Sequence, residues 1–301
     1  MGRELALAFS EARHLFEEID DALKQKLSTL IWEGPEADLT LTENAQPALM
    51  AVSLAVVRVL EKQGGWTIAE KAVYVAGHSL GEYSALAAAG SFSPTAAARL
   101  LKIRGQAMQR AVPVGQGAMA ALLGADFDEV RAIVEAAAGS DVCAAANDNA
   151  PGQVVISGTK AAVDRAIAIA AERGFKRAIP LPVSAPFHCA LMKPAADAMA
   201  EALAEAAIAG PSVPLVANVV AKPVTDPEDI RTLLVEQVTG TVRWRESVLA
   251  MKDLGVTRLV ELGAGKVLSG LAKRIDKEIS AVSLSQPADI EEFLRGVGET
   301  S

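Results

Sequence analysis

Apolar residues recur at helical spacing through the first third of the chain. Residues 11–23 carry one every three or four positions, which predicts an amphipathic helix. Residues 46–65 are apolar on almost every side, so we expect a buried helix that ends at Gly64. The short apolar run at 72–77 then predicts a buried parallel strand. This alternation of helix and strand is typical of an α/β protein.

The pattern changes between residues 115 and 184. We predict in order a strand at 117–124, a helix at 127–139, strands at 141–147 and 153–158, a helix at 160–174 and a strand at 176–183. This order is that of the ferredoxin-like unit. We therefore expect residues 115–184 to form a ferredoxin-like subdomain inserted into a larger α/β domain.

The α/β alternation resumes after residue 185. We predict strands at 213–219 and 257–263, and helices at 227–238, 244–255 and 265–279. Residues 1–114 and 185–301 are accordingly expected to form one α/β core built on a parallel sheet.

Composition restricts the class of function. The chain has 301 residues and a net charge of −8, and an acidic surface disfavours binding to nucleic acid or to an anionic membrane. The N-terminus lacks the uninterrupted apolar stretch of a signal peptide. Cys143 and Cys189 show no metal-ligand spacing, and we expect both to be free thiols. We expect a cytoplasmic protein that binds no metal and no membrane.

The candidate nucleophile is Ser79, at the centre of Gly77-His78-Ser79-Leu80-Gly81. This GxSxG sequence follows the predicted strand and precedes a helix that we expect to open at Glu82, as a nucleophile elbow requires. The two glycines would allow neighbouring chain to pack closely. The alternative is an ordinary strand-to-helix turn.

A serine nucleophile needs a base, and the chain has three histidines. His14 lies on the charged helix 11–23, and His78 is the immediate neighbour of Ser79, where it would shape the elbow. His188 lies between restrictive prolines in PVSAPFHC, which suits a residue that must be held in place. We predict His188 as the base; the alternative is a buried structural histidine. No acidic residue between 178 and 196 could orient it.

Arg104 lies on a helix that we expect after Ser93 and Pro94, an N-cap followed by a first helical residue. The apolar stripe of this helix consists of Ala97, Leu100, Leu101, Met108 and Ala111. Arg104 falls on the same stripe, so we expect its guanidinium to be buried and to need an anion. Residue spacing alone leaves a substrate carboxylate and a protein carboxylate equally open.

Five segments together resemble the malonyl-CoA:acyl carrier protein transacylase family. In chain order they are GHSLGEYSALAAAG, RGQAMQRAVPVGQGAMAALLG, NDNAPGQVVISG, LPVSAPFHCALMKPA and ELGAGKVLSGL. The resemblance implies an α/β-hydrolase-like core with a ferredoxin-like insert. It also implies transfer of a malonyl group from malonyl-CoA to acyl carrier protein through a malonyl-serine, in fatty acid biosynthesis and without a metal or redox cofactor. We expect a monomer.

The resemblance also implies roles for single residues. Ser79 and His188 match the family's catalytic pair, and Arg104 matches the arginine that holds the malonyl carboxylate. Gln237 matches the residue whose backbone carbonyl orients the histidine, and Leu80 matches one that supplies an oxyanion N–H. We assign His78 and Phe187 to the substrate-binding set, since a phenylalanine before the histidine resembles malonyl-selecting members.

One departure concerns the start of the chain. The family begins with a strand and a loop of the type FPGQGSQ, whose glutamine supplies the second oxyanion N–H, whereas residues 1–5 resemble the helix that follows this loop. We expect Met1 to be an internal methionine of the natural protein, and a chain that starts there to be a poor enzyme. A hydrolase that uses water as acceptor and a chain without catalytic power remain the alternatives.

Overall fold

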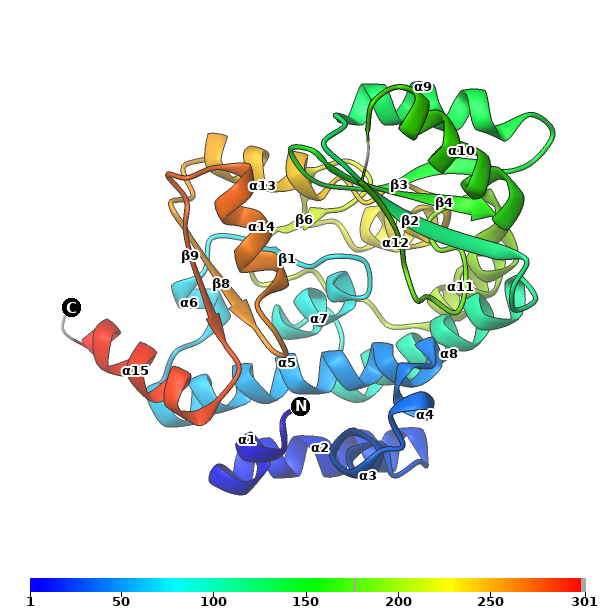
Figure 1. Cartoon of the computed structure of the whole chain (residues 1–301). Helices are drawn as coiled ribbons and strands as arrows, with labels where there is room; N and C mark the ends of the chain where they lie inside the picture. The colour runs from blue at the N-terminus through cyan, green and yellow to red at the C-terminus, as the bar shows by residue number, and fades with distance from the viewer. Residues whose placement is uncertain (176, 299–301) are drawn as a thin grey trace.

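Three small sheets organise the part of the chain that the computed structural model describes, residues 1–175 and 177–298. Figure 1 shows the long helix α5 running across the molecule, with α1–α4 on one side of it and the remaining elements on the other. The C-terminal helix α15 projects at one end, and the helices α9 and α10 lie at the far side from α1–α3.

The first two sheets contain short parallel pairs. In the first, β1 (Val75–Ala76) pairs parallel with β6 (Leu215–Ala217), and β6 pairs antiparallel with β7 (Lys222–Val224). In the second, β8 (Arg258–Leu262) pairs parallel with β9 (Ser280–Leu284). Among the described residues the parallel pairs thus lie in two sheets, where the sequence predicted one. β1 is shorter than predicted at both ends, because Ala72 still caps the preceding helix, Ile68–Lys71, and the chain leaves the strand conformation at Gly77.

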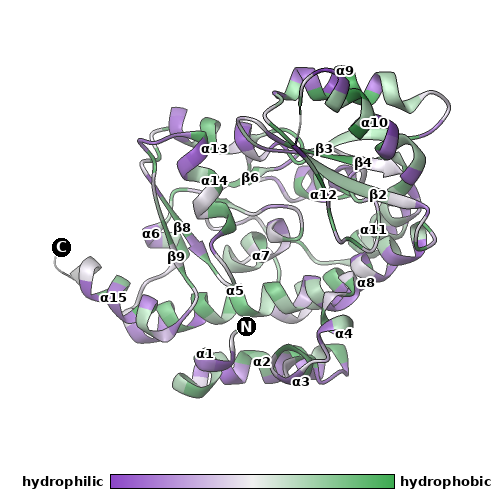
Figure 2. Cartoon of the chain, viewed as in Figure 1, coloured by the Kyte–Doolittle hydropathy of each residue, from purple (hydrophilic) through white to green (hydrophobic). Residues whose placement is uncertain are grey.

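Helix α5 occupies the centre of the largest apolar cluster. Figure 2 shows it as hydrophobic over much of its length. It begins at Thr42, four residues before the predicted start, and ends at Gly64, where Gly65 caps it with a φ of 59°. The helices before and after it are α1 (Arg3–Ala8), α2 (Ser10–Leu23), α3 (Leu27–Glu33), α4 (Glu36–Thr40) and α6 (Ile68–Lys71). The predicted helix at 11–23 is therefore present as α2.

The predicted insert is present element by element. Its elements are β2 (Gly117–Leu123), α9 (Phe127–Ala138), β3 (Cys143–Ala150), β4 (Gln153–Thr159), α10 (Lys160–Glu172) and β5 (Arg177–Pro180). The strands lie in the order β3-β4-β2-β5, and every neighbouring pair is antiparallel. One face of the sheet packs on α9 and α10 in an apolar cluster of its own. Lys176, the first residue of the last predicted strand, lies outside the described residues; 115–184 stays the predicted extent of this subdomain.

Backbone and side-chain contacts tie β3 to the core. The Thr241 hydroxyl donates to the carbonyl of Ala145 at 2.8 Å, and the Asp148 N–H donates to the carbonyl of Val242 at 2.9 Å. The Asp148 carboxylate is buried, and the guanidinium of Arg245 donates to both of its oxygens. One end of the inserted sheet is therefore held against the segment that leads into helix α13.

The remaining helices cover the short core strands. They are α7 (Gly81–Ala88), α8 (Pro94–Ala111), the 3₁₀ turn η1 (Ala190–Met192), α11 (Lys193–Glu205), α12 (Pro227–Thr239), α13 (Trp244–Asp253), α14 (Val267–Ile275) and α15 (Pro287–Gly298). Ser93 caps α8 as predicted, since its hydroxyl accepts the Ala96 N–H at 3.1 Å. The predicted helix at 265–279 ends at Ile275. The elements that the sequence did not predict include β7, β9, α3, α4, α6, α11 and α15. No described helix has the length and apolarity to cross a membrane.

Candidate active site

Ser79 occupies a sharp turn between β1 and α7. Its φ is 54°, a left-handed backbone conformation that costs about 1–3 kcal/mol in a residue with a side chain. A Cβ added to Gly77 would lie 1.9 Å from the carbonyl oxygen of Gly81, so only glycine fits at position 77. A Cβ added to Gly81 would meet nothing within 4 Å. The close approach predicted for both glycines therefore holds for Gly77 alone.

His188 lies against Ser79, the candidate nucleophile. Its Nε2 is 2.8 Å from Ser79 Oγ, and its Nδ1 is 2.9 Å from the carbonyl oxygen of Gln237. A carbonyl oxygen only accepts, so the ring proton belongs on Nδ1, and Nε2 is left to accept the proton of the serine. Burial, and then the positive charge of Arg104, lower the pKa of His188 to about 3. The imidazole is therefore neutral near pH 7 and can act as a base.

Arg104 reaches the same serine from α8. Its side chain is buried, with 1% of its surface exposed. One terminal nitrogen, Nη2, donates to Ser79 Oγ at 3.1 Å and to Gln237 Oε1 at 2.8 Å; the other, Nη1, donates to Gln46 Oε1 at 2.7 Å. Its Nε is buried without a hydrogen-bond partner among the described residues. The candidate base and the guanidinium thus both contact the hydroxyl oxygen of the candidate nucleophile.

The partners of Arg104 are all uncharged. Within residues 1–175 and 177–298, no carboxylate forms a salt bridge with it, although a buried guanidinium is costly without an anion. Burial lowers the pKa of this arginine. The nearest acid in the cluster, Glu82, is separated from it by the Gln237 amide, which donates to Glu82 Oε2 and accepts from Arg104. The contacts therefore do not show a direct salt bridge between Arg104 and a protein carboxylate, one of the two alternatives that residue spacing left open. The Nε N–H of Arg104 remains available to a ligand.

Leu80 follows the nucleophile directly. Its N–H makes no hydrogen bond with another described residue, whereas the N–H of Ser79 donates to Asn218 Oδ1 at 2.8 Å. The Leu80 amide is thus free at the start of α7, where backbone N–H groups favour negative charge. This placement is compatible with the predicted oxyanion role, which stays a prediction.

The other two predicted residues lie at the border with the insert. Nε2 of His78 is 2.8 Å from Asn149 Oδ1 on β3, and the His78 ring packs at a tilt against Trp244 with 5.7 Å between centroids. Phe187 is half-buried and contacts both the core cluster and an apolar cluster on β2–β4. Both residues link the elbow region to the insert; their contact with substrate stays a prediction.

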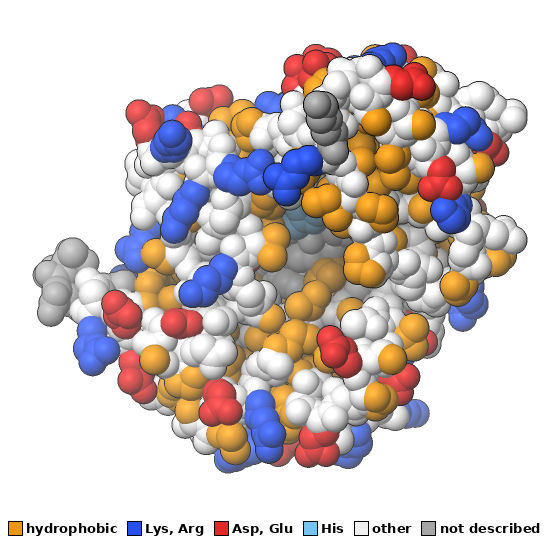
Figure 3. All heavy atoms as spheres, viewed as in Figure 1, with side chains coloured by type: hydrophobic (Ala, Val, Ile, Leu, Met, Phe, Trp, Pro, Cys, Tyr) orange, Lys and Arg blue, Asp and Glu red, His pale blue; other side chains and the backbone are white. Residues whose placement is uncertain are grey.

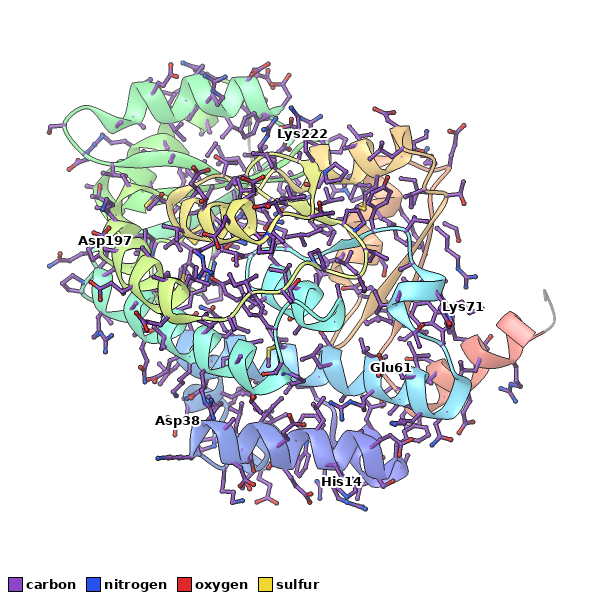
Figure 4. The ribbon with its side chains drawn as sticks, turned by 180° about the vertical axis from the view of Figure 1, so that it is seen from behind. His14, Asp38, Glu61, Lys71, Asp197 and Lys222 are labelled. Atoms are coloured by element: carbon purple, nitrogen blue, oxygen red, sulfur yellow. The ribbon has the colours of Figure 1, made fainter. Side chains whose placement is uncertain are left out.

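The third histidine is remote from this cluster. Figure 4 shows His14 on α2, at the opposite side of the molecule from the inserted sheet. Figure 3 shows a face that is hollowed between the insert and the core helices, with histidine atoms visible inside the hollow. Cys189, which follows His188 in sequence, is buried, and its thiol donates to the Pro186 carbonyl at 3.2 Å.

Comparison with known proteins places this geometry in a family. Residues 1–283 match the acyl transferase domain. The chain belongs to the acyl transferase family. This acyl transferase is 45% identical over 292 residues to the malonyl CoA-acyl carrier protein transacylase of Bacillus subtilis, covering 97% of this chain and 90% of that protein. It is 46% identical over 285 residues to the protein of the same name from Escherichia coli K12, covering 95% and 91%.

Solved structures agree in fold. The crystal structure of an acyl-carrier-protein-S-malonyltransferase from Bartonella henselae matches this acyl transferase with a TM-score of 0.96 and 56% identity, covering 99% of this chain and 95% of that one. A malonyl-transacylase in complex with a type II PKS acyl-carrier protein matches with a TM-score of 0.94 and 43% identity, covering 97% and 94%.

Sequence reasoning missed four polar residues of this acyl transferase's site: Gln46, Glu82, Asn149 and Asn218. Burial raises the pKa of Glu82 to about 8, while its hydrogen bonds to the Asn218 N–H and the Gln237 amide act in the opposite direction. Asn218 stands directly after β6, and a polar residue at the carboxyl end of a buried strand was a usable signal. Gln46 lies inside an apolar helical pattern that gave no such signal.

Proposed function

We propose that this acyl transferase moves a malonyl group from malonyl-CoA to the phosphopantetheine thiol of acyl carrier protein, in fatty acid biosynthesis. The names of its relatives support this proposal, as does the relative whose structure contains an acyl-carrier protein. The group is carried between the two thiols as an ester on Ser79.

The first half-reaction acylates the serine. His188 Nε2 accepts the proton of Ser79 Oγ as that oxygen attacks the thioester carbonyl carbon of malonyl-CoA. The carbonyl oxygen becomes an oxyanion that the Leu80 N–H stabilises. When the intermediate collapses, the C–S bond breaks, His188 gives its proton to the leaving sulfur, and a malonyl ester remains on Ser79.

The second half-reaction runs the same chemistry in reverse. The thiol of the carrier protein gives its proton to His188 and attacks the ester carbonyl carbon. The bond between that carbon and Ser79 Oγ then breaks, and His188 returns the proton to the serine. The reaction leaves every oxidation state unchanged, and the proposed steps use no redox cofactor and no metal.

Arg104 and its surroundings support the choice of malonyl, an acyl group that bears a free carboxylate. Its Nη2 contacts Ser79 Oγ at 3.1 Å, and its Nε has no hydrogen-bond partner among the described residues. In a malonyl ester the carboxylate stands two bonds beyond the ester carbonyl carbon, within reach of a guanidinium that already touches the ester oxygen. A carboxylate there would give this buried charge the anion that no described residue supplies.

Finer features complete the proposal. We infer an α/β-hydrolase-like core with a ferredoxin-like insert, which the strand order β3-β4-β2-β5 supports. We also infer a monomer that acts in the cytoplasm. The net charge of −8 disfavours binding to nucleic acid and to anionic membranes, so the proposal includes neither.

The test separates transfer from hydrolysis. The chain is mixed with malonyl-CoA, and the malonyl-protein adduct is followed by intact-protein mass spectrometry, first in buffer and then after addition of holo-acyl carrier protein. We expect a lasting adduct that disappears when the carrier is added, with malonyl appearing on the carrier. Loss of the adduct to water at the same rate without the carrier would indicate a hydrolase, and no adduct at all would indicate a chain without this activity.

A further inference from the structure

Asn218 is fully buried beside the elbow, and each of its polar groups has a partner. Its side-chain Oδ1 accepts the Ser79 N–H at 2.8 Å, and its Nδ2 donates to the carbonyl of Gly77 at 2.8 Å. Its backbone N–H donates to Glu82 Oε1 at 2.7 Å, and its carbonyl accepts the Arg243 N–H at 3.0 Å. The contacts with Gly77, Ser79 and Glu82 join segments that are more than 100 residues apart in sequence.

The chemistry of the partners fixes the orientation of this amide. The Ser79 N–H can only donate and the Gly77 carbonyl can only accept, so Oδ1 must face Ser79 and Nδ2 must face Gly77. An exchange of the two atoms would set donor against donor and acceptor against acceptor in a buried place, which is costly. A side chain with only acceptors cannot satisfy both groups.

The two groups that Asn218 binds flank the strained part of the elbow. Ser79 has a φ of 54°, and such a conformation persists only where the surrounding structure holds it. We propose that Asn218 is a positioning residue: it holds the backbone of Ser79 so that Oγ points at His188 Nε2, and it occupies the Ser79 N–H so that the Leu80 N–H is the amide left for the acyl oxygen.

Glu82 in turn holds Asn218. It lies one helical turn after the nucleophile on α7, where its own N–H donates to the Ser79 carbonyl at 3.0 Å. Its two side-chain oxygens accept the Asn218 N–H and the side-chain amide of Gln237. The carbonyl of Ser79 also accepts that amide, at 3.0 Å. The backbone of the nucleophile is thus held on both sides, by Asn218 at its N–H and by Glu82 and Gln237 at its carbonyl.

The inference rests on the proposed function only in taking Ser79 as the nucleophile. We would therefore measure the rate at which a fluorophosphonate labels Ser79, since this reagent has no acyl carboxylate and needs no malonyl binding. Ser79→Ala serves as the blank. The variants are Asn218→Ala and Asn218→Asp; the second keeps the shape and the acceptor but turns the donor that faces Gly77 into a second acceptor. The acylation rates with malonyl-CoA and acetyl-CoA are measured alongside.

The matched control is Asp20→Ala. Asp20 is also a buried side chain that accepts a backbone N–H at 2.8 Å, in this case that of Ser28, but it lies on α2 away from the site. The Asp20→Ala variant should lose thermal stability, but the fluorophosphonate should label Ser79 in this variant at the same rate as in the unmodified chain. Thermal unfolding of every variant shows which temperature leaves all of them folded.

We expect Asn218→Ala to label and to acylate about 100-fold more slowly, since a nucleophile misplaced by about 1 Å loses that much. The loss should lie in kcat rather than KM and be equal for malonyl and acetyl groups. Asn218→Asp should not recover the rate. The inference is overturned if a folded Asn218→Ala labels as fast as Asp20→Ala, or if its loss lies in KM for malonyl-CoA alone. Labelling that persists in Ser79→Ala would instead refute the proposed function.

Discussion

Arg104 and Arg245 each reach into a buried polar cluster, and the two clusters differ in what faces the guanidinium. Arg245 donates from Nε to both oxygens of Asp148 at 3.0 Å, and its Nη2 adds a contact at 2.8 Å. Arg104 contacts two amide oxygens and a hydroxyl and keeps a buried Nε without a partner. The guanidinium of Arg245 is thus paired with a carboxylate of the protein, whereas the guanidinium of Arg104 has no such anion among the described residues.

The difference separates a structural from a ligand-binding role. Arg245 joins α13 to β3 and so fixes the inserted sheet on the core. Arg104 lies at the nucleophile and has donors to spare, as a residue that recognises a carboxylate must. Sequence spacing alone left the two roles of Arg104 equally open, and the contacts favour the ligand.

The largest effect on activity should come from removing Ser79 Oγ, the oxygen that both Arg104 and His188 contact. Ser79→Ala should abolish the malonyl-protein adduct and lower turnover by a factor on the order of 10⁶, as loss of a nucleophile does in other serine enzymes. Intact-protein mass spectrometry after exposure to malonyl-CoA measures it. An adduct that persists in the variant would place the nucleophile elsewhere and remove the basis of the comparison.

The next effect tests the missing anion. Arg104→Ala should weaken the reaction of malonyl-CoA by about 2–5 kcal/mol, the cost of truncating one partner of a buried charge pair. This corresponds to roughly 30-fold to 5,000-fold in kcat/KM. Acetyl-CoA has no free carboxylate and should lose much less. Equal losses with the two substrates would make Arg104 structural, like Arg245.

Removing the guanidinium of the Arg245–Asp148 pair should change the stability of the protein rather than its choice of substrate. Arg245→Ala leaves the Asp148 carboxylate buried without its guanidinium, and we expect it to lower the free energy of unfolding by about 1–3 kcal/mol. The ratio of malonyl to acetyl activity should not change. Denaturant unfolding measures the first and kcat/KM the second. The matched control is Arg131→Ala on α9, which removes an exposed pair with Asp128 and should change stability by less than about 1 kcal/mol.

The smallest effect concerns pH. Burial and the charge of Arg104 lower the pKa of His188 to about 3, so its neutral, proton-accepting form extends to lower pH than in an ordinary histidine. The kcat/KM of serine acylation should therefore stay nearly level from pH 7 to pH 5.5, where a base of pKa about 6.5 would lose roughly tenfold. In Arg104→Ala the charge that lowers the His188 pKa is absent, so the acid limb of the pH–rate profile should move to higher pH. An acid limb near pH 6.5 in the unmodified chain would contradict this assignment.

The sequence predicted those parts of the site that a local pattern encodes. A strand, GHSLG and a helix placed Ser79 on an elbow, and the apolar stripe of α8 placed Arg104 on a buried face. The Gln237 carbonyl could be named only through the family resemblance, because every residue carries a carbonyl and no pattern marks the one that is used. Asn218 was missed because it meets Ser79 only once the chain has folded.

In the fold, long periodic segments were predicted better than short ones. The strands and helices of the insert were all anticipated, whereas β1 has two residues within the six predicted. The helix predicted to reach residue 279 ends at Ile275, where Asp276 leaves the helical conformation and its carboxylate accepts the Glu278 N–H at 2.8 Å. An aspartate side chain that binds the backbone two residues later stabilises a turn in place of the helix. The spacing of apolar residues does not detect such a turn.

The close approach of Gly77 to the carbonyl of Gly81 sets how the elbow can vary in sequence. At position 77 even a methyl group would overlap the facing backbone, so randomising this position in a library would yield misfolded elbows. At position 81 an added Cβ would meet nothing within 4 Å, and the backbone there is helical. Substitutions at position 81 should therefore leave the turn that carries Ser79 intact, so a library of elbow variants can vary this position while it keeps glycine at position 77.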